Sequence, residues 1–441
     1  AWGPASKSCK SLLNRVGNND PTLTTLTILP NKDFTDEDML KLSGIIASGK
    51  NTHLTSFYAS GHHVSPTCLN GFGSALKIAF CNHKSFLNDL AFGCKNMGDE
   101  GIIMFCKGYY NEADVSCPGR PGIIRLDFSA KGLTSESFLE IVRTFSQGCM
   151  KHLNLSDNDF SKLGPIDHIC NQSFSRLETL NLARCNLNGS NLNEIAKFLE
   201  GSNFESIELI LSGNPLASGS KHLSMLSNKI HSLKLDGCRV CDDDVEDMLA
   251  ENGLGEKLRC LDLSCNSIRS NTLARIANVM KANESLVDIN LSQNPLTDDC
   301  VESFVTFLHE SNKSLSSLNL SQTNLNAETA RKLFRVPRLS NLCLFNNNLG
   351  GGDFFSCPTT AKLIASSDLC TLDLCGNNAT DLDTLLYTLY ECYKEDNGAT
   401  RKLDVLELGG NVVKESDEIW ISKLKRLGLD VARDRPAQNQ I

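Results

Sequence analysis

Two groups of cysteine and histidine residues are of types that bind metals or carry redox chemistry. The first is Cys238-x-x-Cys241, whose spacing is that of half of many zinc sites and of thioredoxin-like redox motifs. The second has no standard zinc spacing and consists of His62, His63, Cys68, Cys81 and His83. We predict no metal and no cofactor for this chain, because the repeat pattern described below gives the residues of both groups packing positions.

Signatures of catalysis are missing from the sequence. It contains no P-loop, no Gly-x-Ser-x-Gly elbow, no His-Glu-x-x-His motif and no dinucleotide-binding fingerprint. We therefore predict that the protein is not an enzyme and has no catalytic residues.

The charge, the lack of long apolar runs and the cysteine count indicate which partners and which cellular compartment to expect. The 441 residues include 43 basic and 52 acidic ones, for a net charge of −9, which argues against nucleic acid as a partner. The sequence contains no run of about 18 apolar residues, so we predict no membrane span. The stretch "AWGPASKSCKSLL" lacks the layout of a secretory signal. Nineteen cysteines, an odd number, fit a reducing compartment better than a disulfide framework. We predict a cytoplasmic protein.

One eleven-residue frame, L-x-x-L-x-L-x-x-N-x-L, recurs along most of the chain. It fits "LETLNLARCNL" from Leu177, "LRCLDLSCNSI" from Leu258 and "LDVLELGGNVV" from Leu403, and it has degenerate copies nearer the N-terminus. The copies number about fourteen, with a mean period of roughly 29 residues. Their fourth positions are Leu26, Phe57, Leu90, Leu126, Leu153, Leu180, Leu209, Leu233, Leu261, Ile289, Leu318, Leu342, Leu372 and Leu406.

Each copy predicts a short strand followed by a helix. Positions four and six alternate with polar residues, which indicates a strand with one buried face, and Asn at position nine can bond the backbone of a tight bend. Thr297 then predicts a helix start, and an apolar stripe follows it at Val301, Phe304, Val305 and Leu308. A second stripe is Leu273, Ile276, Ala277 and Met280. Stacked units of this kind predict one α/β solenoid, curved into a horseshoe with a parallel inner β-sheet and outer α-helices.

This frame resembles the leucine-rich repeat, and its long helical repeats resemble the ribonuclease-inhibitor-like subclass. The stretch "GDEG" from Gly98 is similar to the helix start of that subclass. The resemblance covers roughly residues 23 to 415. It implies that cysteine can replace Asn at position nine, so that Cys185 and Cys238 are expected to be buried thiols in the bend. Cys241 then opens the following helical half.

The predicted array needs caps at both ends, because terminal repeats must hide their apolar sides. We expect an N-terminal cap over residues 1–22, the repeat array over 23–414, and a C-terminal cap with a frayed tail over 415–441. The inward residues of the caps are expected to be Leu12, Leu13, Val16, Trp420, Leu424 and Leu427.

Position five lies at the centre of the predicted inner face, which is the usual binding surface of such a horseshoe. We predict that partner-binding residues there are Asp127, Asn154, Asn181, Lys234, Asp262, Asn290, Asn319, Asp373 and Glu407; the same position holds Ile210 and Cys343. Four acids against one lysine favour a partner with a basic patch, although a ladder of Asn can also be structural. A turn-rich insertion, "CKGYYNEADVSCPGRPG" from Cys106, adds Tyr109 and Tyr110 as candidates, and the convex side remains a third possibility.

We expect a non-enzymatic scaffold or recognition module that binds another protein and can form part of a larger complex. Two alternatives stay open. The subclass includes Ran GTPase-activating proteins, although the acidic tail typical of them is missing and no residue here can be assigned their role. It also includes the sensor halves of NOD-like receptors, so the chain could be one part of a larger receptor.

Overall fold

The structure is a computed structural model. It describes residues 8–83, 85–110, 122–146, 148–166, 174–226, 228–249, 257–269, 271–282, 284–395 and 401–433. The chain divides into two compact units, Ala1–Ile230 and His231–Ile441, and each is described by itself.

Short parallel strands follow one another in chain order within each unit. In the first unit they are β1 (Thr25–Thr27), β2 (Ser56–Ser60), β3 (Asp89–Gly93), β4 (Arg125–Asp127), β5 (His152–Asn154), β6 (Thr179–Asn181) and β7 (Ile207–Ile210). β8 (Ile230–Lys234) begins at the boundary residue. The second unit continues with β9 (Cys260–Asp262), β10 (Asp288–Asn290), β11 (Ser317–Asn319), β12 (Asn341–Cys343), β13 (Thr371–Asp373), β14 (Val405–Glu407) and β15 (Asp430–Ala432).

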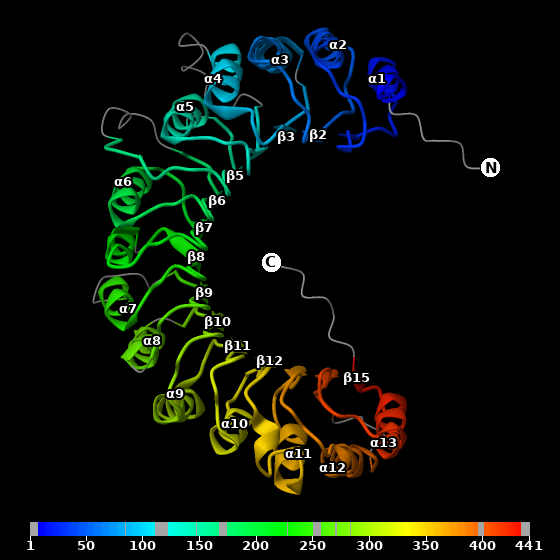
Figure 1. Cartoon of the computed structure of the whole chain (residues 1–441), viewed down its shortest axis with the longest axis vertical. Helices are drawn as coiled ribbons and strands as arrows, with labels where there is room; N and C mark the ends of the chain where they lie inside the picture. The colour runs from blue at the N-terminus through cyan, green and yellow to red at the C-terminus, as the bar shows by residue number, and fades with distance from the viewer. Residues whose placement is uncertain are drawn as a thin grey trace, which may run out of the picture. The chain divides into compact units, whose positions relative to one another are not determined.

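Helices alternate with the strands, and within each unit they lie together on one side of the sheet (Figure 1). In the first unit they are α1 (Lys10–Gly17), α2 (Asp36–Ala47), α3 (Pro66–Ile78), the π-helix η1 (Ala79–His83), α4 (Gly98–Tyr109), α5 (Ser135–Phe145), α6 (Gly189–Glu200) and the 3₁₀ helix η4 (Ser220–Leu226). In the second they are α7 (Asp242–Met248), α8 (Asn271–Ala282), α9 (Asp298–Ser311), α10 (Ala327–Leu333), the 3₁₀ helix η5 (Leu349–Gly351), α11 (Pro358–Ala365), α12 (Asp383–Tyr393) and α13 (Glu415–Arg426).

The repeat frame sets the register of the strands. Position-four residues are direct partners on neighbouring strands, for example Leu153 with Leu180 and Leu318 with Leu342. These side chains are buried against the helices, while positions three and five point to the opposite side. We call that opposite side the strand face; it corresponds to the inner face predicted from the sequence. The prediction of a leucine-rich-repeat solenoid with a parallel sheet and outer helices is confirmed.

The predicted helical stripes are also found in the structure. In α9 the buried residues are Val301, Phe304, Val305 and Leu308, and the helix begins after Thr297. In α8 the predicted stripe is buried at Leu273, Ile276, Ala277 and Met280. The apolar period therefore placed both helices correctly.

The regions assigned to caps contain elements of the expected kind. α1 buries Leu13 and Val16, and α13 buries Leu424, while Trp420 is only half-buried. A strand that the frame does not mark, β15, pairs with β14 through Val431 and Leu406. The capping role and the domain limits stay predictions, and residues 434–441 of the tail lie outside the described residues.

No helix in the described part of the chain has both the length and the apolar character needed to cross a lipid bilayer.

Candidate protein-binding face

The position-five residues of the first unit form hydrogen-bonded steps along the strand face. Asp127 Oδ1 accepts bonds from the backbone N–H and the hydroxyl of Ser129, at 2.9 and 2.6 Å. Its other oxygen accepts from the amide of Asn154, one strand away, at 3.0 Å. Asn181 accepts from the backbone N–H of Ala183. These half-buried side chains are thus fixed by their own turns and by their neighbours.

The second unit repeats this arrangement. Asp262 accepts from the N–H and hydroxyl of Ser264, and from the amide of Asn290 at 3.0 Å on the next strand. Burial, reinforced by the nearby Asp236 carboxylate, raises the pKa of Asp262. The remaining predicted residues of this unit also lie half-buried on the strand face, at Lys234, Asn319, Asp373 and Glu407. The structure therefore brings together the predicted strip within each unit.

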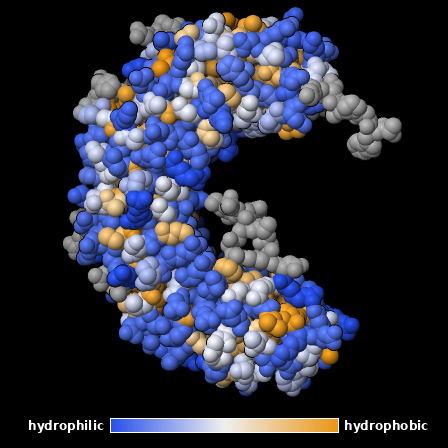
Figure 2. All heavy atoms as spheres, viewed as in Figure 1, coloured by the Kyte–Doolittle hydropathy of each residue, from blue (hydrophilic) through white to orange (hydrophobic). Residues whose placement is uncertain are grey.

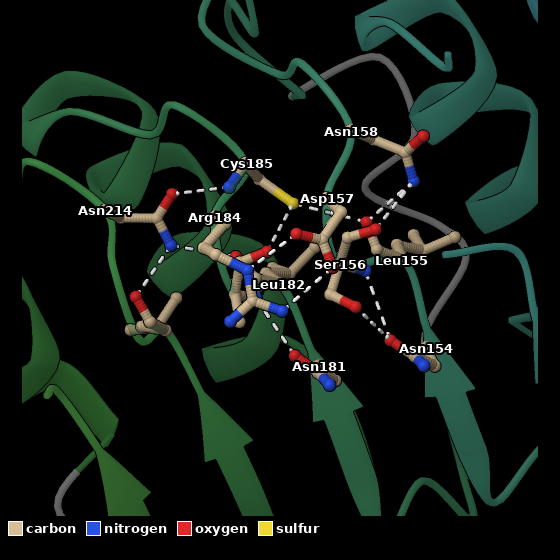
Figure 3. Close-up of polar contacts among 12 residues, drawn as sticks. Asn154, Leu155, Ser156, Asp157, Asn158, Asn181, Leu182, Arg184, Cys185 and Asn214 are labelled. Atoms are coloured by element: carbon tan, nitrogen blue, oxygen red, sulfur yellow. Dashed lines mark hydrogen bonds and ion pairs between the residues drawn. The ribbon is translucent and has the colours of Figure 1, made fainter. Parts of the chain in front are cut away.

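The bend after each strand is built around position nine (Figure 3). The Asn214 side chain is fully buried, and its oxygen accepts from the backbone N–H groups of Cys185 and Leu187 in the preceding repeat. Its amide donates to the carbonyls of Leu182 and Leu211 at 2.8 and 2.6 Å. Asn at this position thus satisfies backbone groups that burial would otherwise leave unpaired.

Cysteine occupies the same slot in two repeats. Cys185 is buried, and its thiol donates to the Leu155 carbonyl at 3.2 Å. Cys238 is also fully buried in its bend, whereas Cys241 is the residue just before α7 and its thiol donates to Asp244 at 3.1 Å. The two sulfurs of the Cys-x-x-Cys stretch hold different structural positions, as the repeat frame predicts.

The described side chains of the histidine and cysteine group near the N-terminus, those of His62, His63, Cys68 and Cys81, form no metal-ligand cluster. His62 is buried, with Nε2 3.3 Å from the Ile28 carbonyl, and the Cys68 thiol faces the Asp36 carbonyl. Among the described side chains, the metal-ligand types that do converge belong to another cluster, formed by Asp373, Cys375 and Glu407.

Position three supplies a second row on the strand face, which the sequence analysis did not single out. In the first unit the position-three Asp89 accepts a hydrogen bond at 2.7 Å from the hydroxyl of Tyr58, a position-five residue of the neighbouring strand, and the position-three His152 lies 3.7 Å from the Glu178 carboxylate. Burial, helped by the Arg125 charge, lowers the pKa of His152. The sequence already implied this second row, because positions three and five of a strand must share one face.

The two insertion tyrosines lie at the end of α4, away from the strand face. Tyr109 packs against Phe145, with ring centroids 5.2 Å apart, and burial raises its pKa. Tyr110 is the residue at which α4 stops. Residues 111–121 of the insertion lie outside the described residues, so a binding role for this segment stays a prediction.

An open depression of about 420 Å³ lies beside the bends of the first unit. Asp157 and Arg184 line it and pair across it, at 2.6 and 2.8 Å. Its other lining residues are Gly132, Leu133, Thr134, Asn158, Asp159 and Asn186. These groups can recognise a polar ligand, and they include no pair of a nucleophile and a base.

Comparisons with known families, sequences and structures each found a similar protein. The Leucine Rich Repeat family model matches residues 176–198. The ribonuclease inhibitor of Mus musculus is 24% identical over 385 residues, which cover 78% of this chain and 81% of that protein. The crystal structure of an internalin from Listeria monocytogenes aligns with 97% of this chain and 93% of its own, at 12% identity and a TM-score of 0.37. The repeat frame, the strand-and-helix units and the family-model match identify the chain as a leucine-rich-repeat protein, and its sequence is distantly similar to ribonuclease inhibitor.

Proposed function

We propose that this chain is a non-enzymatic recognition module that binds another protein through its strand face. The observation that carries the proposal is the pair of polar rows at positions three and five. The position-five row is held by hydrogen bonds within the chain, such as Asn154 to Asp127 and Asn290 to Asp262. A surface fixed in this way loses little conformational entropy when it binds a partner.

The charge of the strand face favours a partner with a basic patch. In the second unit Asp262, Asp373 and Glu407 share the position-five row with one lysine, Lys234. The exposed Asp288 lies beside them in the position-three row. On the side of the molecule turned to the viewer in Figure 2, which shows the repeats edge-on, hydrophilic residues predominate over apolar ones. We expect electrostatic steering to contribute to the association rate.

The name of the mouse relative supplies one concrete candidate, a ribonuclease. Thiols that form no disulfide, such as those of Cys9, Cys106, Cys185 and Cys375, occur in both units, which supports our proposal of a cytoplasmic, reducing location. Neither point identifies the partner, so the first experiment is a pull-down from the native source, with a ribonuclease panel tested in parallel for inhibition.

The binding face is tested with the captured protein and charge-reversal variants. Arg125→Glu and Asp288→Lys change exposed position-three residues and leave the position-five bonds intact. Lys281→Glu on α8 and Asp299→Lys on α9 change exposed helical residues in the same direction of charge. We expect at least one strand-face variant to weaken binding by about tenfold or more, and both helical variants to change it less than about twofold.

Weakened binding in the helical variants, with both strand-face variants unaffected, would assign the interface to the helical side. Loss of binding in Tyr110→Ala with both strand-face variants unaffected would assign it to the insertion. If the captured protein is a GTPase whose hydrolysis accelerates when the chain is added, the function is regulation of an enzyme rather than binding alone.

A further inference from the structure

Three neighbouring strands of the second unit place soft and hard metal ligands together. β12, β13 and β14 pair so that Cys343 faces Asp373 and Asp373 faces Glu407, all at position five. Cys375 follows Asp373 by two residues, at position seven. One ligand atom from each of Asp373, Cys375 and Glu407 lies within 4.8 Å of the other two.

Comparison with the other two position-five aspartates shows that this cluster is unusual. Asp127 and Asp262 each accept a bond from a position-seven serine hydroxyl, at 2.6 and 2.7 Å. Each also accepts from an Asn amide on the next strand. At Asp373 the serine is replaced by Cys375, and the residue on the next strand is Glu407 instead of Asn. The serine hydroxyl and the Asn amide found beside Asp127 and Asp262 are thus replaced, beside Asp373, by a thiol and a second carboxylate.

Two adjacent carboxylates without an amide between them repel each other. A cation placed between Asp373 and Glu407 would remove this repulsion.

We propose that Asp373, Cys375 and Glu407 bind a zinc ion on the strand face of the second unit. A thiolate and two carboxylates form a ligand set that suits Zn²⁺, whereas Ca²⁺ and Mg²⁺ prefer oxygen alone. Zinc–ligand bonds of about 2.0–2.3 Å place ligand atoms about 3.5 Å apart, so binding would draw the three side chains together from their present spacing of at most 4.8 Å. On binding, the Cys375 thiol proton is released to solvent and its sulfur bonds to the metal.

The surrounding groups hold the ligands in place. The backbone N–H of Cys375 donates to Asp373 Oδ1 at 2.8 Å, and the Cys343 thiol donates to Asp373 Oδ2 at 3.0 Å. The chain on either side of Cys375 is anchored to the next repeat, by Leu374 N–H to the Glu407 carbonyl and by Gly376 N–H to the Gly409 carbonyl. Cys343 acts here as a positioning residue for Asp373, which leaves the fourth coordination position of the zinc for water or for an outside ligand.

The test uses the full chain, purified without a histidine tag, reduced and stripped with a chelator. Zn²⁺ is titrated in competition with a chromophoric chelator, and Co²⁺ is titrated separately to detect thiolate-to-cobalt absorption. We expect one tight zinc equivalent per chain and a cobalt–thiolate band. Cys375→Ser and Glu407→Gln should each weaken zinc binding by tenfold or more, and Cys375→Ser should remove the band.

Two matched variants control for the other acids and thiols. Asp262→Asn changes the aspartate that has Ser264 and Asn290 as partners, and Cys265→Ser removes an exposed thiol at position eight. Both should bind zinc like the parent chain, and circular dichroism should show that all four variants are folded. Absence of a tight equivalent, or full binding by both Cys375→Ser and Glu407→Gln, would overturn the proposal. These titrations involve no protein partner, so their outcome is independent of the proposed function.

Discussion

Arg184 and Asp157 form a two-point ion pair between the bends of adjacent repeats. Nε and one terminal nitrogen of Arg184 donate to the two carboxylate oxygens at 2.6 and 2.8 Å (Figure 3). Both residues have left-handed backbone, with φ of 51° and 59°. Position eight of the frame thus holds side chains in a conformation that most residues avoid, and here the two side chains bind each other.

This pair predicts a small pH-dependent contribution to stability. The hydrogen bond from Arg184 lowers the pKa of Asp157, so the pair contributes most above the unfolded pKa near 4, and the contribution is lost as the pH falls through the lower folded value. Because the two side chains are 60% and 37% exposed, Asp157→Asn should cost at most about 1 kcal/mol at pH 7. Urea unfolding should show this difference shrinking below about pH 4; a difference that grows there would contradict the assignment.

Replacing each of two glycines of α3 by alanine should change the free energy of unfolding in opposite directions. A Cβ on Gly73 would lie 2.3 Å from the Phe105 carbonyl oxygen of α4, whereas a Cβ on Gly71 would meet nothing within 4 Å. Gly73→Ala must push α4 away and should lower the free energy of unfolding by about 2–3 kcal/mol. Gly71→Ala should raise it by about 0.5–1 kcal/mol, because alanine favours a helix interior. Chemical denaturation of both variants checks the pair, and equal effects would count against this close helix contact.

Removal of a position-nine side chain should be costly. Asn214→Ala leaves the N–H groups of Cys185 and Leu187 and the carbonyl of Leu182 without their side-chain partner. We expect a loss of about 3 kcal/mol or more, since each buried unpaired group costs about 1–3 kcal/mol. Asn214→Cys should lose less, because Cys185 shows that a thiol can donate to the same kind of carbonyl.

The control for this series is Asn341→Ala, which removes an exposed amide on β12. It should change the midpoint of urea unfolding little. Equal losses at the two positions would contradict the structural role of position nine.

The raised pKa of Asp262 predicts a pH dependence of stability opposite in sign to that of Asp157. Burial raises the pKa of Asp262 in the folded state, so its contribution to stability is present at low pH and is lost as the pH rises through the folded value. Asp262→Asn should therefore gain stability relative to the parent at pH 7, and this advantage should fall as the pH is lowered to about 4. Paired urea titrations at the two pH values measure it, with the exposed Asp288→Asn as the control for removal of a negative charge. An advantage that grows at low pH would contradict the assignment.

The repeat frame predicted the fold far better than it predicted the site. A two-residue period and a single apolar stripe were enough to locate Leu153, Leu318 and α9, because those patterns report burial directly. β15 escaped notice because its copy of the frame is reduced to Leu429 and Val431. Whether a position-five side chain is offered to a partner or bonded within the chain depends on its neighbours, as the bond from Asn154 to Asp127 shows.

The metal cluster was partly visible in the sequence. Cys343, Asp373 and Glu407 occupy position five in three consecutive repeats, so parallel register alone places them side by side. The sequence did not single out Cys375, because position seven elsewhere holds small residues whose side chains serve the turn. Its sulfur lies within 4.8 Å of both carboxylates only in the folded structure.

The position-nine bonds run in one direction along the chain. Asn158 binds the N–H groups of Lys131 and Leu133, Asn214 those of Cys185 and Leu187, and Asn377 those of Asn347 and Leu349. Every repeat in this series is completed by its successor. During synthesis, a newly emerged repeat would hold an unfinished bend until the ribosome had delivered the next one, so the folded boundary should trail the exit tunnel by one repeat. Shortening the array from its C-terminal side would likewise leave the N–H groups of the last bend without their position-nine partner.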